Sequence, residues 1–94
     1  MTDLKPSDIV QSLAGHDRGE TFLVLDTGKG FALVADGRHR TSAKPKRKNV
    51  KHLAYKAACT SPVAARIQRG ESVADSEIRK ALAPYRAATA KGGN

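Results

Sequence analysis

The sequence has few aromatic residues, one cysteine and no long apolar run. Its 94 residues include two Tyr, two Phe and no Trp, so a deep aromatic-lined ligand pocket is not expected. Cys59 is the only cysteine, which excludes an intrachain disulfide and fits a reducing compartment. The longest nearly apolar stretch, residues 30–35, is far too short to span a bilayer, and residues 1–6 contain no apolar segment of a secretory signal. We therefore expect a cytoplasmic protein without a membrane segment.

The patterns of catalytic and metal-binding sites are also missing. His16, His39, His52 and Cys59 do not have the spacing of a zinc finger. Residues 28–30 (Gly-Lys-Gly) lack the longer pattern of a phosphate-binding P-loop and lie between two apolar segments, where a hairpin turn explains them. We expect no enzymatic activity, metal, cofactor or small-molecule substrate.

Acidic residues are absent from a long central part of the chain. Between Gly37 and Gly70 there is no Asp or Glu, whereas ten Lys and Arg occur there. The whole chain has 17 Lys and Arg against 9 acids, a net charge of +8. Basic side chains neutralise phosphates and release condensed counterions, so such an excess on a small chain favours a nucleic-acid partner. The alternative is a basic surface that only faces solvent.

Turn signals separate several short apolar segments. Asp36-Gly37 after an apolar run is typical of a type I′ hairpin, in which both residues have positive φ. Arg38 and Arg40 would then project from one face of the returning strand, and Pro45 would leave residues 43–48 as a basic loop. Short strands joined by tight turns favour a small antiparallel barrel. The strands are expected at 8–13, 20–26, 31–35, 38–42 and 49–53.

The last third of the chain favours helices. Ser61-Pro62 is typical of a helix start, and Gly70 would stop that helix after about Arg69. A second helix would begin near Asp75 or Ser76 and would be kinked or ended by Pro84. Its apolar face is formed by Ile78, Ala81, Leu82 and Tyr85.

The turn of residues 15–19 carries a resemblance to a known family. An apolar strand, Gly15-His16-Asp17-Arg18-Gly19 and a second apolar strand resemble the KOW motif of SH3-like barrels in ribosomal proteins and transcription elongation factors. Residues 10–19, 33–38 and 44–53 together resemble small KOW-domain RNA-binding proteins similar to large-subunit ribosomal proteins. Phe22 stands where many KOW motifs carry a further glycine, which argues against the transcription-factor branch.

The resemblance implies a mainly β fold with an SH3-like barrel in residues 1–54. The residues that follow predict a helical extension packed on it in 55–86 and a disordered tail in 87–94. It implies RNA as the partner, ribosomal RNA in particular and through it the large ribosomal subunit. A protein-docking module of the SH3-like type, as in transcription or translation factors, is the alternative.

The expected RNA-binding residues are basic side chains of the first turn, the hairpin, the basic loop and the last strand. They are Arg18, Arg38, Arg40, Lys44, Lys46, Arg47, Lys48, Lys51 and His52. Turn-shaping roles are expected for Gly15, Asp17, Gly19, Asp36 and Gly37. Asp17 would cap the turn backbone. Replacing residues 46–48 with Glu should weaken RNA binding and leave the fold intact.

Overall fold

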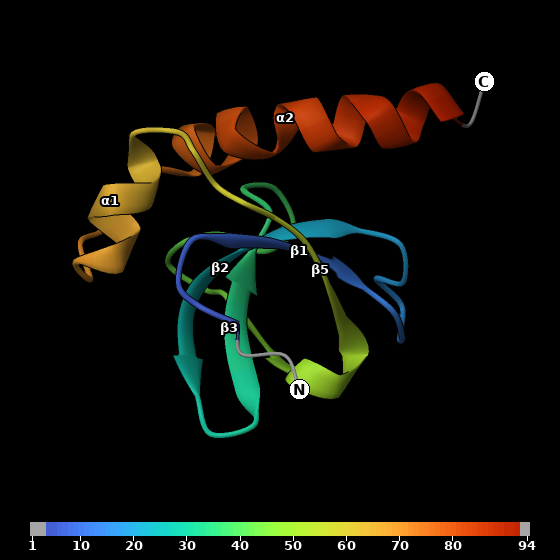
Figure 1. Ribbon diagram of the computed structural model, residues 1–94, viewed down its shortest axis with the longest axis horizontal. Coiled ribbons are helices and arrows are strands. Elements are labelled where there is room, and N and C mark those ends of the chain that lie inside the picture. Colours follow the sequence, from blue (N-terminus) through green and yellow to red (C-terminus); the bar gives the residue numbers. More distant parts are fainter. Residues whose placement is uncertain (1–3, 93–94) are drawn as a thin grey trace.

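Five antiparallel strands form one sheet, and two helices pack against it (Figure 1). The computed structural model describes residues 4–92, and the side chains of residues 4–86. The strands are β1 (Asp8–Ser12), β2 (Thr21–Gly28), β3 (Phe31–Ala35), β4 (Lys46–Asn49) and β5 (Leu53–Ala58), in the spatial order β4-β3-β2-β1-β5. The expectation of a mainly β fold with an antiparallel sheet and two helices is confirmed.

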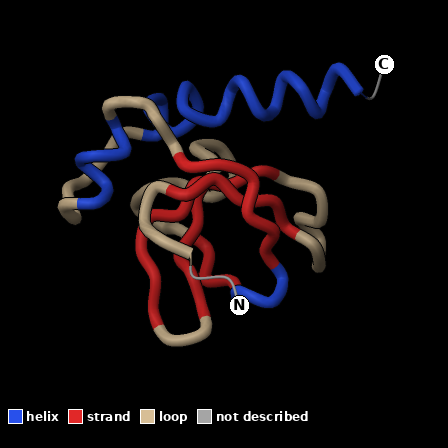
Figure 2. Tube along the Cα trace, in the orientation of Figure 1, coloured by secondary structure: helices blue, strands red, loops and turns tan. Residues whose placement is uncertain are grey.

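The sheet is rolled but not closed. β4 and β5 lie at its two edges, yet only the 3-10 helix η1 (Val50–His52) joins them. In a flat sheet these edges would be roughly 19 Å apart, at about 4.8 Å per strand. The connection from Asn49 to Leu53 could span at most about 14 Å even if extended. The sheet must therefore curl, as Figure 2 shows, and bulges in β5 and β2 help it to bend.

Apolar residues are buried on both faces of the sheet. On the inner side Val10, Phe22, Val24 and Val34 belong to one buried cluster. On the outer side a second cluster joins alternate strand residues to the helices: Ile9, Leu23, Ala35, Cys59, Val63, Ala64, Ile67, Val73, Ile78, Ala81 and Leu82. Successive residues of a strand point to opposite faces, which explains why β2 begins with an unbroken buried run.

The helices begin close to where the sequence places them. α1 (Val63–Gln68) follows Pro62, and Gly70 ends it with φ of +79°. α2 (Asp75–Gly92) begins at the expected Asp75 and presents its apolar face to the sheet. It crosses one side of the rolled sheet (Figure 1).

Four local expectations differ from the structure. Residues 38–42 form no strand but part of a loop, and the expected basic loop ends early because β4 starts at Lys46. The single strand expected at 49–53 is the end of β4, then η1, then the start of β5, which continues to Ala58. Pro84 does not end α2, which continues past it, although the proline leaves the Lys80 carbonyl without its helical donor. Residues 87–92 are thus helical instead of a disordered tail, and 93–94 lie outside the described residues.

Candidate nucleic-acid interface

The buried carboxylate of Asp36 orders the first half of the loop between β3 and β4, residues 36–45. Its Oδ1 accepts the backbone N–H groups of Arg38 at 2.8 Å and Arg40 at 2.9 Å. The N–H groups of Asp36 and Gly37 donate to the carbonyl of Arg40 at 2.9 and 3.0 Å. Gly37 has φ of +80°, but Ser7 is the only non-glycine with positive φ in the described part of the chain. The expected type I′ hairpin is therefore wrong, and a side-chain-capped loop takes its place.

The basic side chains of this loop face solvent. Arg38, Arg40 and Lys44 are exposed, and none of them forms an ion pair within residues 4–86. His39 projects beside them, with 90% of its side chain exposed. Because Asp36 fixes the backbone between the two arginines, their positions are defined while their charges stay available to an anion.

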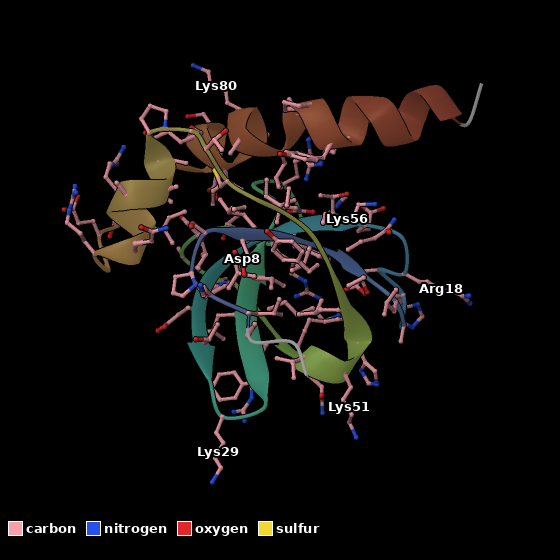
Figure 3. All side chains as sticks on the ribbon, viewed as in Figure 1. Asp8, Arg18, Lys29, Lys51, Lys56 and Lys80 are labelled. Carbon is pink, nitrogen blue, oxygen red and sulfur yellow. The ribbon has the colours of Figure 1, made fainter. Side chains whose placement is uncertain are left out.

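The β1–β2 turn has the shape that its glycines allow. Gly15 and Gly19 have φ of +88° and +92°, as their expected turn roles require. The Gly19 N–H donates to the Ser12 carbonyl at 2.8 Å, which closes the turn. Arg18 is exposed at its tip and points away from the sheet (Figure 3).

Asp17 does not cap the turn backbone, and Lys48 is not at the surface. Both expectations are wrong for one reason: the two side chains bind each other inside the protein. Lys48 Nζ donates to Asp17 Oδ1 at 2.9 Å, to Ser12 Oγ at 3.0 Å and to the Ala14 carbonyl at 2.9 Å. Only 6% of the Lys48 side chain and 14% of the Asp17 side chain are exposed. This buried network connects the edge strand β4 to the β1–β2 turn.

Lys46 belongs partly to the same network. Its Nζ lies 3.1 Å from Asp17 Oδ2, and 29% of its side chain is exposed. Burial alone would raise the pKa of the Asp17 carboxyl group, but hydrogen bonds from Lys48, Ser12 and Lys46 outweigh it and hold that pKa well below the ordinary value of 3.8. Asp17 is therefore ionised at neutral pH, and it engages Lys48 fully and Lys46 to a lesser extent, although both were expected to bind RNA.

Arg47 points to the other face of β4. Its guanidinium lies 4.0 Å from the centroid of the Phe31 ring, on the exposed outer side of the sheet. A cation over an aromatic face is held by the ring quadrupole. The three consecutive basic residues of β4 thus have three different environments.

η1 brings Lys51 and His52 next to the β1–β2 turn. Asn49 caps η1 by accepting the Lys51 N–H at 2.9 Å, and both basic side chains are exposed. The Leu13 N–H donates to the His52 carbonyl at 2.8 Å. In Figure 3, Lys51 lies on the same side of the molecule as Arg18.

The β1–β2 turn contacts both the loop 36–45 and η1, which lie at the two opposite ends of β4. The β1–β2 turn and the loop 36–45 form a cleft of about 220 Å³, to which Glu20, Arg38 and His39 contribute. Lys46 and Lys48 join the turn to β4, and η1 lies on its other flank. We call the exposed cations of these three segments the basic rim: Arg18, Arg38, Arg40, Lys44, Lys51 and His52. Six of the nine expected RNA-binding residues belong to this rim. Of the other three, Lys48 is buried, Lys46 forms an ion pair with Asp17, and Arg47 packs on the Phe31 ring.

Two α2 residues that sequence reasoning left out lie beneath the rim. Arg79 Nη1 donates to the Gly37 carbonyl at 2.6 Å, and Arg86 Nη2 donates to the Asp36 carbonyl at 2.9 Å. Burial lowers the pKa of Arg86. The positive charges of Arg38 and Arg79 lower it further, while the negative charge of Asp36 opposes this change. A polar stripe at helical spacing beside the apolar stripe of α2 is the sequence signal that could have indicated them.

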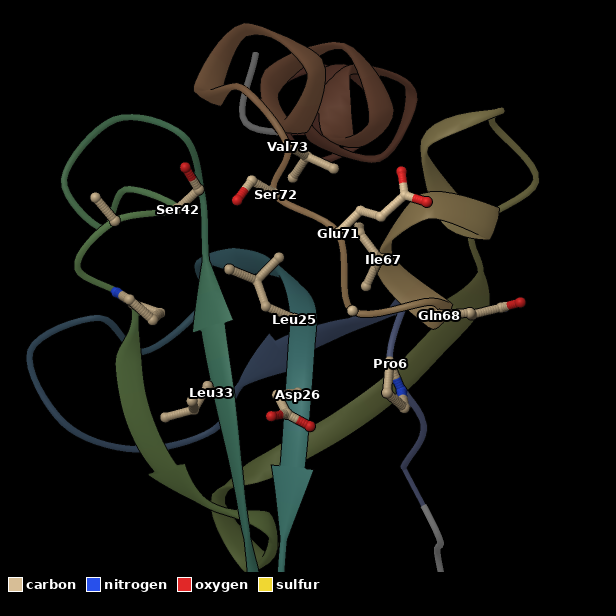
Figure 4. Close-up of a pocket in the computed structure, with 13 residues that line it drawn as sticks. Pro6, Leu25, Asp26, Leu33, Ser42, Ile67, Gln68, Glu71, Ser72 and Val73 are labelled. Atoms are coloured by element: carbon tan, nitrogen blue, oxygen red, sulfur yellow. The ribbon is translucent and has the colours of Figure 1, made fainter.

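A second hollow lies beside the loop 36–45, whose residues Ser42, Ala43 and Pro45 line part of it. It is a groove of about 450 Å³ between the sheet, the end of α1 and the segment before α2 (Figure 4). Leu25, Leu33, Ile67 and Val73 supply its apolar lining. Asp26 and Glu71 also line it, so its charge is unlike that of the basic rim.

Two other kinds of feature, a membrane-spanning helix and a metal site, are not found among residues 4–92. No helix among the described residues is both long and apolar enough to cross a membrane. Within the same residues, no group of three His, Cys, Asp or Glu side chains is placed to hold a metal ion. No protein-family model matches the sequence, and a search of curated proteins finds no match.

Proposed function

We propose that this protein is a non-enzymatic, cytoplasmic RNA-binding protein that binds ribosomal RNA through its basic rim. The observation that carries the proposal is the loop 36–45, where a buried carboxylate orders the backbone. Arg38, Arg40 and Lys44 of this loop are exposed and have no acidic partner among the side chains of residues 4–86. A surface that only needed solubility would not require this order. Fixed, unpaired cations at the end of a small barrel-like sheet suit a phosphate backbone of defined shape.

We further propose that the rolled sheet is an SH3-like barrel of the KOW type. The Gly15–Gly19 motif lies between β1 and β2, and both of its glycines have the positive φ that a tight turn requires. Few aromatic side chains are available to stack on unpaired bases, so phosphate contacts and shape would supply most of the affinity. A structured segment of ribosomal RNA is the kind of partner that this favours.

Salt dependence of RNA binding tests the proposal directly. If the rim and its neighbours neutralise about four to six phosphates, a plot of log affinity against log salt should have a slope of roughly −3 to −5. The probe is a labelled structured fragment of large-subunit ribosomal RNA, followed by fluorescence anisotropy. An affinity that does not change with salt would overturn the phosphate mechanism.

A pair of charge-matched variants locates the contact. Arg38→Gln/Arg40→Gln should weaken binding by roughly tenfold or more at low salt and make the slope about two less negative. Lys29→Gln/Lys80→Gln removes the same charge outside the loop 36–45, from α2 and from the β2–β3 turn at the opposite end of β3 (Figure 3). Equal losses in the two variants would show that net charge, and not the rim, decides affinity.

Sedimentation of the tagged protein through a sucrose gradient tests the ribosome. We expect co-migration with the large subunit at low salt, lost at high salt or after RNase. A protein that stays at the top of the gradient in every condition would remove the ribosome from the proposal.

The groove beside α1 favours a second candidate, a protein-docking module. Its apolar lining includes Leu33 on the outer face of β3. A partner that remains bound after RNase, is lost in Leu33→Glu and is kept in Arg38→Gln/Arg40→Gln would support docking in place of RNA binding.

A further inference from the structure

The loop 36–45 does not hold its shape by itself. Between β3 and β4 it spans ten residues without strand pairing. Its own hydrogen bonds are the Asp36 cap, two backbone bonds to the Arg40 carbonyl and a short turn at Thr41–Lys44. A segment of this length would lose conformational entropy on ordering that so few local bonds do not offset. Something outside the loop must contribute to its order.

α2 supplies that contribution through polar contacts along one side of the helix. Asp75 Oδ1 accepts the Ser42 N–H at 2.7 Å. One turn later Arg79 donates to the Gly37 carbonyl at 2.6 Å, and two turns further Arg86 donates to the Asp36 carbonyl at 2.9 Å. The partners are 33, 42 and 50 residues apart in the sequence, so these are tertiary contacts. The helix thus bonds the loop backbone near both of its ends.

Steric contact at Gly37 shows how closely loop and helix approach. A Cβ atom at this position would lie 2.6 Å from the Asp75 carbonyl oxygen and 2.8 Å from Arg79 Cγ. Only glycine fits there, and its φ of +80° also favours glycine. The loop backbone therefore rests directly on the first turns of α2.

The helix is itself fixed to the sheet. Ile78 and Leu82 are fully buried and belong to the cluster that contains Leu23 and Ala35. The polar residues that bond the loop stand beside this apolar stripe. Movement of α2 away from the sheet would therefore break the loop contacts as well.

We infer that α2 holds the loop 36–45 in its RNA-binding shape, so that Asp75, Arg79 and Arg86 are positioning residues of the RNA interface and RNA binding is coupled to the docking of α2. This rests on the proposed function. Arg38 lies close enough to Arg86 for their charges to repel. A phosphate bound at Arg38 would reduce that repulsion, and coupling between two sites is reciprocal. RNA should therefore strengthen the docking of α2.

Asp75 gives a test in which charge and positioning predict opposite results. Asp75→Ala removes a negative charge, which by electrostatics alone would raise RNA affinity, but it also removes the acceptor of the Ser42 N–H. We expect affinity to fall roughly fivefold to tenfold, as one lost hydrogen bond implies. Asp75→Asn keeps an acceptor oxygen, so its affinity should equal or exceed that of the wild type. A rise in affinity in Asp75→Ala would overturn the inference.

Amide hydrogen exchange separates this inference from the proposed function. In Asp75→Ala, exchange at the amides of Arg38, Arg40 and Ser42 should accelerate, while the amides of β2 keep their protection. Lys80→Ala is the control, because the Lys80 side chain points away from the sheet (Figure 3), and it should leave the exchange of both groups of amides unchanged. Faster loop exchange with unchanged RNA affinity would overturn the positioning role and would not affect the proposed RNA binding. If the wild-type protein does not bind RNA, the proposed function is wrong. The exchange data would still show whether α2 orders the loop.

A second pair of variants covers the case in which Asp75→Ala does not fold. Arg79→Lys keeps a cation that can donate to the Gly37 carbonyl, whereas Arg79→Ala does not. We expect faster loop exchange and weaker RNA binding in the alanine variant, and substantial rescue of loop protection in the lysine variant. Equal loop exchange in both variants would contradict the inference.

Discussion

The loop 36–45 and the strand β4 that follows it form one basic run in the sequence, but they use their charges differently. In the loop Arg38, Arg40 and Lys44 are exposed and unpaired within residues 4–86. In β4 Lys48 is buried and Lys46 is paired with Asp17. The difference follows from the pleat of a strand, because alternate residues of β4 point into the rolled sheet. A basic run can therefore serve binding in one half and stability in the other.

The largest effect expected from this comparison is on the buried lysine. Lys48→Met leaves the Asp17 carboxylate without its main partner, and we expect a loss of about 3 kcal/mol in the free energy of unfolding. Lys44→Met, an identical change in the loop, should stay within about 0.5 kcal/mol of the wild type. Urea denaturation measures both. Similar values for the two variants would break the comparison. The charge reversal of residues 46–48 suggested by the sequence would accordingly damage the fold.

Acid should weaken the same network by protonating the Asp17 carboxylate. A carboxyl group whose pKa is lowered in the folded state stabilises the protein fully above its unfolded pKa near 3.8, and that contribution is lost as the pH falls through the lower folded pKa. We expect Asp17→Asn to cost about 2 kcal/mol at pH 7, because it leaves the Lys48 ammonium buried without a counter-charge. The difference from the wild type should shrink progressively below about pH 4. A difference that is constant from pH 7 to pH 2 would contradict this account.

Substitution of Gly37 tests how much the contact between the loop 36–45 and α2 contributes to stability. Gly37→Ala places a Cβ against the α2 backbone at positive φ, and we expect it to cost about 2 kcal/mol. Gly30→Ala is the matched control, since Gly30 has nearly the same φ but nothing within 4 Å of the added atom. It should cost about 1 kcal/mol, for the backbone conformation alone. Thermal unfolding of the two variants isolates the contact between loop and helix.

The smallest effect is expected at the exposed face of β4. Arg47→Gln removes a cation from the Phe31 ring, which we expect to cost about 0.5 kcal/mol. Arg40→Gln, with no aromatic or acidic partner among the described side chains, should change stability less than that. Equilibrium denaturation with replicate measurements can resolve such a difference. An Arg40→Gln variant as unstable as Lys48→Met would show that the loop cations also support the fold.

Local sequence signals determined much of this protein. The strands of residues 8–12, 21–28 and 31–35 follow from short apolar runs bounded by turn residues. The glycine turn between β1 and β2 follows from positions that need positive φ, and the helix starts follow from Ser61-Pro62 and Asp75. The absence of acids from the central segment marks the basic run. These features depend on neighbours in the chain, and so they are visible without a structure.

Tertiary structure alone decided which charges are free. Asp36-Gly37 looks like a hairpin turn, but its conformation is set by contacts with α2, and the Asx-capped loop replaces the expected strand at 38–42. Lys48 looks like Lys44 in the sequence, yet the rolled sheet brings it to Asp17, 31 residues away. Burial and ion pairing are properties of distant segments that meet only on folding. For this reason the sequence marks where positive charge gathers, and the fold selects the side chains that can meet a phosphate.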